Sequence, residues 1–182
     1  MIQEKGSISI TTENIFPIIK KWLYSEKDIF IRELVSNSAD AISKLKKLQS
    51  IGEAPATGQE EFRITVSVSK KAKTIKVIDN GIGMTDEEVK KYINQIAFSG
   101  ARDFLEKYRD KTDDQHIIGH FGLGFYSAFM VADKVQIDTL SYQEGAQAVR
   151  WISSGDTEYE MTGSDRDKTG TTVTLYMADD SI

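Results

Sequence analysis

The sequence contains no cysteine and no long apolar run, and each absence excludes a class of protein. Without cysteine there is no disulfide and no thiolate metal site, which agrees with a reducing cytosol. No apolar run approaches the roughly 18 residues needed to span a bilayer, and the N-terminus lacks the basic and apolar regions of a signal peptide. We therefore expect a soluble, cytoplasmic protein that does not insert into a membrane.

Histidine is also scarce, and positive charge does not dominate. The two histidines, His116 and His120, are four residues apart, but Gly119 lies between them and the helical zinc-protease pattern is not met, so we interpret them as loop residues. The 23 basic and 28 acidic side chains give a net charge of −5. This balance does not favour nonspecific binding to nucleic acid or to an anionic membrane.

The hydrophobic pattern predicts one α+β domain, with helices on one face of a mostly antiparallel sheet. Helical periodicity covers residues 28–49 and 86–96, and an apolar helix is expected over 125–132. An earlier helix is predicted from Thr11 or Thr12 to Leu23, after a short strand at Ile8 and Ile10. Alternating segments predict a hairpin over 63–69 and 74–79, and then meander strands over 134–140, 146–153, 157–162 and 171–177.

The long helix carries a polar sector that a core helix does not need. At 3.6 residues per turn, Glu33, Asn37 and Asp40 fall within about 60° of one another. Phe30, Leu34, Ala41, Leu45 and Leu48 form a separate apolar stripe, which faces a core. We therefore expect the polar sector to face something other than the core, such as a binding pocket.

The segment DNGIGM, from Asp79 to Met84, follows a strand and precedes a helix. In one interpretation it is an ordinary turn, because Asn-Gly is common in turns. In the other it is the floor of a pocket: Asp79 faces inward, where a donor such as an exocyclic amine offsets the cost of a buried charge. Gly81 and Gly83 then allow a planar ring to approach the backbone, and Met84 gives an apolar contact. The segment alone leaves both interpretations open.

The segment GHFGLGF, from Gly119 to Phe125, leads directly into an apolar helix. Backbone N–H groups at such a glycine-rich start form an anion site, whose usual occupant is phosphate, although glycine spacings also recur by chance. The spacing is neither that of a P-loop nor that of a dinucleotide fingerprint. A polar run, RDKTDD, precedes it and is either a solvated loop or a lid.

The three segments together predict an ATPase. Magnesium takes hard oxygen ligands and few from the protein when phosphates supply the rest, so Asn37 suffices as a protein ligand. Glu33, one turn away, is placed to orient or deprotonate a water that attacks the terminal phosphoryl group.

The ordered motifs, Glu33 to Ala41, Asp79 to Gly83 and Gly119 to Gly124, resemble the Bergerat-type ATP-binding fold, a two-layer sandwich shared by gyrase, heat-shock protein 90, histidine kinases and MutL. FIRELVSNSADAISKL, DNGIGMT and IGHFGLGFYSAFMVADKV are most similar to the heat-shock protein 90 chaperones of the bacterial high-temperature protein G type. The similarity covers nearly the whole chain. MutL resembles the first motif, but the FYSAF continuation is chaperone-like.

The resemblance implies a role for each matching residue. Asn37 matches the magnesium ligand, Glu33 the catalytic base and Asp79 the partner of the adenine amine. Gly83 and Thr171 match positions that bind adenine with an ordered water, and Met84 matches the pocket wall. The other nucleotide-binding positions are Asp40 and Ala41 on the helix, and Gly119, Gly122, Gly124 and Phe125 in the phosphate-facing turn. Residues 100–124 match a mobile lid, and Phe98 stands where relatives usually have a lysine near the phosphates.

The resemblance further implies an N-terminal domain, residues 1–182, of a longer heat-shock chaperone. That protein hydrolyses ATP to ADP with Mg²⁺, remodels unfolded client proteins in the cytoplasm during stress, and dimerises. Its middle-domain arginine finger is absent from this chain, so hydrolysis by the isolated chain is expected to be weak. Two alternatives stay open: a nonenzymatic nucleotide sensor, and a histidine-kinase catalytic domain, which should lack the FYSAF continuation.

Overall fold

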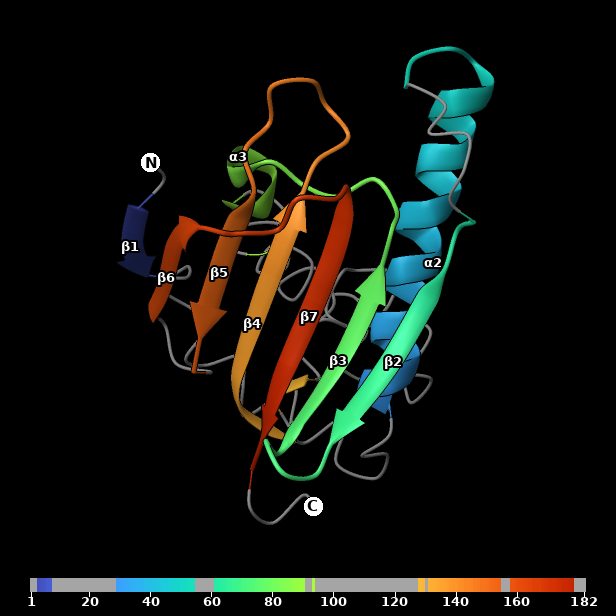
Figure 1. Cartoon of the computed structure of the whole chain (residues 1–182). Coiled ribbons are helices and arrows are strands. Elements are labelled where there is room, and N and C mark those ends of the chain that lie inside the picture. Colours follow the sequence, from blue (N-terminus) through green and yellow to red (C-terminus); the bar gives the residue numbers. More distant parts are fainter. Residues whose placement is uncertain are drawn as a thin grey trace, which may run out of the picture.

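The computed structural model describes residues 3–7, 29–54, 61–90, 93, 128–129, 131–154 and 158–178. Its elements are β1 (Gln3–Ser7), α2 (Ile29–Ser50), β2 (Ile64–Ser69), β3 (Thr74–Asp79), α3 (Asp86–Val89), β4 (Ala132–Leu140), β5 (Val149–Ser153), β6 (Glu158–Gly163) and β7 (Gly170–Met177). The strands form one sheet in the order β1-β6-β5-β4-β7-β3-β2, and every pair is antiparallel. The helices lie on one side of this sheet, with α2 behind β2 and β3 (Figure 1). The predicted α+β two-layer architecture is confirmed.

The long helix and the first hairpin were predicted to within a residue or two. α2 places Phe30, Leu34 and Leu45 in the interior, with exposed fractions of 7%, 2% and 4%. These three residues belong to the predicted apolar stripe, so the 3.6-residue period alone identified the face that packs on the sheet. β2 and β3 pair from Ile64 opposite Asp79 to Ser69 opposite Thr74, as a hairpin.

The later strands were recognised individually, but their order was not. β4, β5 and β6 pair consecutively as the predicted meander. β7 departs from it, because it returns to the other side of β4 and also pairs with β3. This crossing brings the start of β7 beside the end of β3, with Thr171 directly opposite Asp79. A meander would have left β7 beside β6, away from that end.

Two helix boundaries differ from the sequence prediction. The helix predicted over 125–132 extends too far, because Ala132 already pairs with Met177 as the first residue of β4. α3 begins at Asp86 as predicted, because Thr85 and Glu88 form a capping box. Its α-helical part ends at Val89, and Lys90 and Ile93 have π-helical geometry. Ile8, Ile10 and the early helix predicted to end at Leu23 lie outside the described residues.

The core lies between the sheet and the helical layer. Along β4, Val135 and Ile137 point inward and are 0% and 1% exposed, and Trp151 and Met161 on the next strands are fully buried. This alternation is what a strand with one covered face requires. Of the helices that the structure describes, none has both the length and the apolar character needed to cross a bilayer.

Candidate functional site

The predicted polar sector of α2 is divided between exposed and half-buried positions. Asn37 and Asp40 are exposed, whereas Glu33 is half-buried. Burial raises the pKa of the Glu33 carboxyl, and the neighbouring Arg32 guanidinium opposes this rise. A carboxyl with a raised pKa is a better proton acceptor when it is ionised, so Glu33 has the character expected of a general base.

Asp79 ends β3 with its carboxyl group buried against α2. The residue is 4% exposed, and its Oδ1 accepts a hydrogen bond of 2.9 Å from the Gly81 N–H. Burial raises the pKa of the Asp79 carboxyl; hydrogen bonds from Gly81, Ser38 and the Thr171 backbone, and the charge of Arg166, oppose the rise. A carboxylate offers about four acceptor sites, so these three donors leave room for a further one.

The loop after Asp79 packs against α2 on one side and against the end of β4 on the other. The Ile82 N–H donates to the Ala41 carbonyl of α2 at 3.1 Å, and a Cβ on Gly81 would lie 2.6 Å from the Ala41 carbonyl carbon. Gly83 has φ +66°, and its Cβ would lie 1.9 Å from the Leu140 carbonyl oxygen. Both glycines are therefore required by close backbone approach, which a simple turn would not need.

A row of polar side chains crosses three neighbouring strands on the α2 side of the sheet. Asp79 on β3 lies opposite Thr171 on β7, and Thr171 lies opposite Thr139 on β4. The hydroxyls of Thr139 and Thr171 are 2.8 Å apart, and the Met84 N–H donates to Thr139 at 2.9 Å. The structure thus brings together three predicted site residues, Asp79, Met84 and Thr171, at one end of the sheet.

Sequence reasoning missed two members of this group, Ser38 and Thr139. Ser38 is 5% exposed and lies between Leu34 and Ile42 on the apolar face of α2. Thr139 is fully buried and continues the inward series of Val135 and Ile137. In each case the available signal was a polar residue in phase with buried positions, because such a residue needs a hydrogen-bonding partner inside the protein.

The remaining predicted site residues are not placed. Gly119, Gly122, Gly124, Phe125 and Phe98, together with the lid over 100–124, lie outside the described residues, so the phosphate-facing turn stays a prediction. Among the residues that the structure does describe, no cluster of three or more His, Asp or Glu side chains could hold a metal ion. The predicted magnesium ligands, Asn37 and phosphate oxygens, stay a prediction.

A comparison with protein families agrees with this geometry. Residues 24–172 match the family described as histidine kinase-, DNA gyrase B- and HSP90-like ATPases. The matched residues include α2, the Asp79 loop and the start of β7. The chain belongs to this family of ATPases.

Comparison with individual proteins shows which members of the family this chain is similar to. The chain is 58% identical over 177 residues to a chaperone protein HtpG of Bacteroides fragilis and 52% identical over 181 residues to one of Porphyromonas gingivalis, which cover 97% and 99% of this chain. It is 44% identical over 160 residues, 87% of the chain, to one of Hydrogenovibrio crunogenus. The chain spans about a quarter of the length of these curated relatives, 25–26%. The predicted resemblance to the heat-shock protein 90 group of this ATPase family is confirmed.

Proposed function

We propose that this chain is the nucleotide-binding and ATP-hydrolysing domain, residues 1–182, of a cytoplasmic molecular chaperone. The observation that carries the proposal is the buried carboxyl of Asp79, fixed between Ser38 of α2 and the Gly81 N–H, beside Thr171. A buried carboxylate with room for another donor suits the exocyclic amine of adenine, which offers a fixed N–H at the edge of a planar ring.

Each site residue binds a particular part of the nucleotide. Asp79 accepts from the adenine amine, Thr171 and Gly83 hold an ordered water at the ring, and Met84 contributes an apolar wall. Asp40 and Ala41 line the helix side. The phosphates reach the turn formed by Gly119, Gly122, Gly124 and Phe125, where backbone N–H groups favour an anion.

Glu33 and Asn37 act at the phosphate end. Asn37 supplies a carboxamide oxygen to Mg²⁺, which when bound neutralises charge that develops on the phosphates. Glu33, with its raised pKa, orients a water and takes its proton during attack on the terminal phosphoryl group. Turnover should therefore fall as the pH drops through the pKa of Glu33, which lies above that of free glutamate.

The chaperone role is proposed from the relatives, which are named chaperones. In the longer protein, closure of the lid over 100–124 on ATP would couple nucleotide state to N-terminal dimerisation and to remodelling of unfolded clients under heat stress. This chain alone should hydrolyse ATP far more slowly than the longer protein, because a cation supplied from outside the site contributes roughly 10³–10⁵ in rate.

Two substitutions on α2 separate catalysis from binding. Glu33→Ala should abolish ATP turnover in the longer protein while leaving ADP affinity nearly intact, because the attacking water lies beyond the last phosphate of ADP. Asn37→Ala should weaken ADP binding only when magnesium is present. Glu53→Ala is the matched control, because Glu53 is an exposed glutamate beyond the end of α2.

The outcomes distinguish the proposal from its rival. Turnover that persists in Glu33→Ala, with ADP binding intact, would mean that Glu33 is not the catalytic base. ATP binding without turnover in the wild-type longer protein would favour the nonenzymatic nucleotide sensor. Equal losses of ADP affinity in Glu33→Ala and Asn37→Ala, with or without magnesium, would mean that the polar sector is structural.

A further inference from the structure

Arg166 lies in the connection between β6 and β7, in the charged run SDRDK, and such runs are typical of solvated loops. Its guanidinium is half-buried and joins three segments. Nε donates to the Lys168 carbonyl at 2.8 Å, Nη1 to the Thr172 hydroxyl at 2.7 Å, and Nη2 to the Asp79 backbone carbonyl at 3.0 Å. The last contact connects residues 87 positions apart in the sequence.

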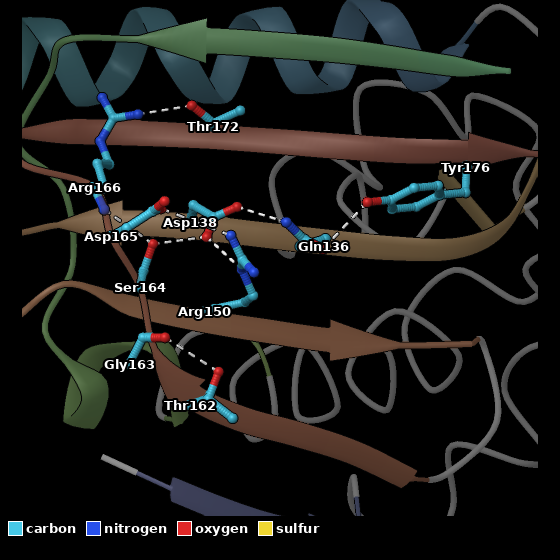
Figure 2. A network of polar contacts seen from close by, with 10 residues as sticks. All are labelled: Gln136, Asp138, Arg150, Thr162, Gly163, Ser164, Asp165, Arg166, Thr172 and Tyr176. Carbon is cyan, nitrogen blue, oxygen red and sulfur yellow. Dashed lines mark hydrogen bonds and ion pairs between the residues drawn. The ribbon is translucent and has the colours of Figure 1, made fainter. Parts of the chain in front are cut away.

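These contacts reach the proposed adenine residues from the far face of the sheet. The Thr172 hydroxyl lies on the face opposite α2, because Thr171, its neighbour, faces Thr139 and Asp79 on the α2 side. Figure 2 shows Arg166 and Thr172 on that open face, with α2 behind the strands. Arg166 thus holds the backbone of Asp79 and the residue next to Thr171 from the face opposite the proposed adenine site.

The approach of the guanidinium depends on the glycine that begins β7. Gly170 has φ +134°, and a Cβ there would lie 2.6 Å from Nη2 of Arg166 and 2.2 Å from the Asp79 carbonyl oxygen. A side chain at this position would displace either the guanidinium or the end of β3. The absence of a side chain at Gly170 therefore leaves the space that the Arg166 guanidinium occupies between β3 and β7.

Arg166 is itself held in place by a hydrogen-bonded network on the open face. Its N–H donates to the Ser164 hydroxyl at 3.3 Å, and that hydroxyl donates to Asp138 at 2.8 Å. Asp138 also accepts from Nε of Arg150 at 2.7 Å and from Gln136 at 2.8 Å (Figure 2). The loop that carries Arg166 is therefore anchored to β4 and β5.

We propose that Arg166 is a positioning residue that fixes Asp79 and Thr171 relative to each other and so sets the selectivity of the site for adenine. The proposal rests on the proposed nucleotide site. A carboxylate discriminates an exocyclic amine from an oxygen only if its direction is fixed, since a mobile carboxylate can turn away from an unfavourable partner. Arg166 supplies this restraint by holding the backbone from which the Asp79 carboxylate projects.

The test compares the affinities for ADP and for inosine diphosphate, which has an oxygen where adenine has its amine. Wild type should prefer ADP. Arg166→Gln should reduce the ratio of the two affinities by about threefold to tenfold. This effect is smaller than the loss of at least about tenfold expected when a charge-assisted hydrogen bond is removed, because Asp79 itself remains and only its direction is less fixed. Arg150→Gln is the matched control, because the Arg150 guanidinium pairs with Asp138 and not with Asp79. Ser164 keeps its own hydrogen bond to Asp138 in this variant, so the ratio should stay unchanged while the stability falls.

Further variants keep the result decisive. Arg166→Lys retains the charge but not the fork, so the ratio should stay low; a ratio restored by lysine would overturn positioning in favour of charge alone. If Arg166→Gln does not fold, Thr172→Val removes one contact of the fork and should lower the ratio in the same direction. An unchanged ratio in that variant would overturn the proposal.

Asp79→Asn separates this inference from the function on which it rests. If wild type binds ADP and Asp79→Asn lowers the ratio while Arg166→Gln does not, then the positioning role is wrong and the nucleotide site stands. If wild type binds neither nucleotide, both the proposed function and the role of Arg166 are wrong.

Discussion

The glycine after Ile82 gives a stringent test of how tightly the Asp79 loop is held. Gly83 and Gly52 both have positive φ, +66° and +78°, so an alanine at either position has a similar backbone cost of roughly 1–2 kcal/mol. They differ in their surroundings. A Cβ on Gly52 meets nothing within 4 Å, whereas a Cβ on Gly83 would lie 1.9 Å from the Leu140 carbonyl oxygen. The difference between the two variants therefore isolates the steric term.

The magnitude follows from what must move. Leu140 pairs with Gly170 in the ladder of β4 and β7, so we expect the loop to shift rather than the strand. Overpacking of this kind costs about 1–3 kcal/mol. The shift also strains the hydrogen bonds from the Met84 N–H to Thr139 and from the Tyr142 N–H to the Ile82 carbonyl. Each of these two hydrogen bonds contributes about 0.5–1.5 kcal/mol. Added to the overpacking cost, they give a destabilisation of Gly83→Ala that is roughly 2–6 kcal/mol larger than that of Gly52→Ala.

Urea unfolding at neutral pH measures both variants against wild type. We expect Gly83→Ala to lower the free energy of unfolding by at least about 2 kcal/mol more than Gly52→Ala, a large share of the roughly 5–15 kcal/mol typical of a domain. Equal losses in the two variants would refute the reasoning, because they would mean that the loop can move away from β4 without breaking its contacts.

Two titratable groups give predictions of opposite sign. Burial raises the pKa of Asp79, so the ionised carboxylate destabilises the ligand-free fold. The free energy of unfolding of wild type, relative to Asp79→Asn, should fall as the pH rises from about 3.9 through the folded pKa, and a flat difference would contradict this. Burial also acts to raise the pKa of Asp138, but hydrogen bonds from Gln136, Arg150 and Ser164 outweigh it and the pKa is lowered. Asp138→Asn should therefore lower the free energy of unfolding by about 1–3 kcal/mol above pH 4, a range that is reduced because the Arg150 side chain is 36% exposed to solvent. This loss should vanish as the pH falls through the lowered pKa of Asp138. A cost that persists in acid would mean that packing, not charge, holds this network.

The sequence identified residues whose partners are local or whose pattern is periodic. α2 and the β2–β3 hairpin followed from periods of 3.6 and two, and Asp79, Gly81 and Gly83 followed from a motif that needs no knowledge of the fold. Strand order was not predictable in this way, because alternation marks a strand but does not name its neighbours. The return of β7 to β3 was therefore not predicted, and Thr171 entered the predicted site only through the resemblance.

The residues that hold the site residues in place could not be predicted from the sequence for the same reason. Ser38, Thr139 and Arg166 acquire their roles from partners distant in the sequence, such as the 55 positions between Met84 and Thr139. Arg166 in particular sits in a run of charges that a sequence assigns to solvent. Only the tertiary structure shows that its guanidinium reaches the end of β3.

Calorimetric titration of ADP into wild type and Asp79→Asn measures whether the buried carboxyl of Asp79 recognises adenine. The asparagine presents donors where the amine needs an acceptor, and loss of a charge-assisted hydrogen bond in a buried site costs about 1.5–3 kcal/mol. ADP should bind the variant at least about tenfold more weakly, although the variant should be no less stable than wild type at neutral pH. An unchanged affinity for ADP would mean that Asp79 does not contact the adenine.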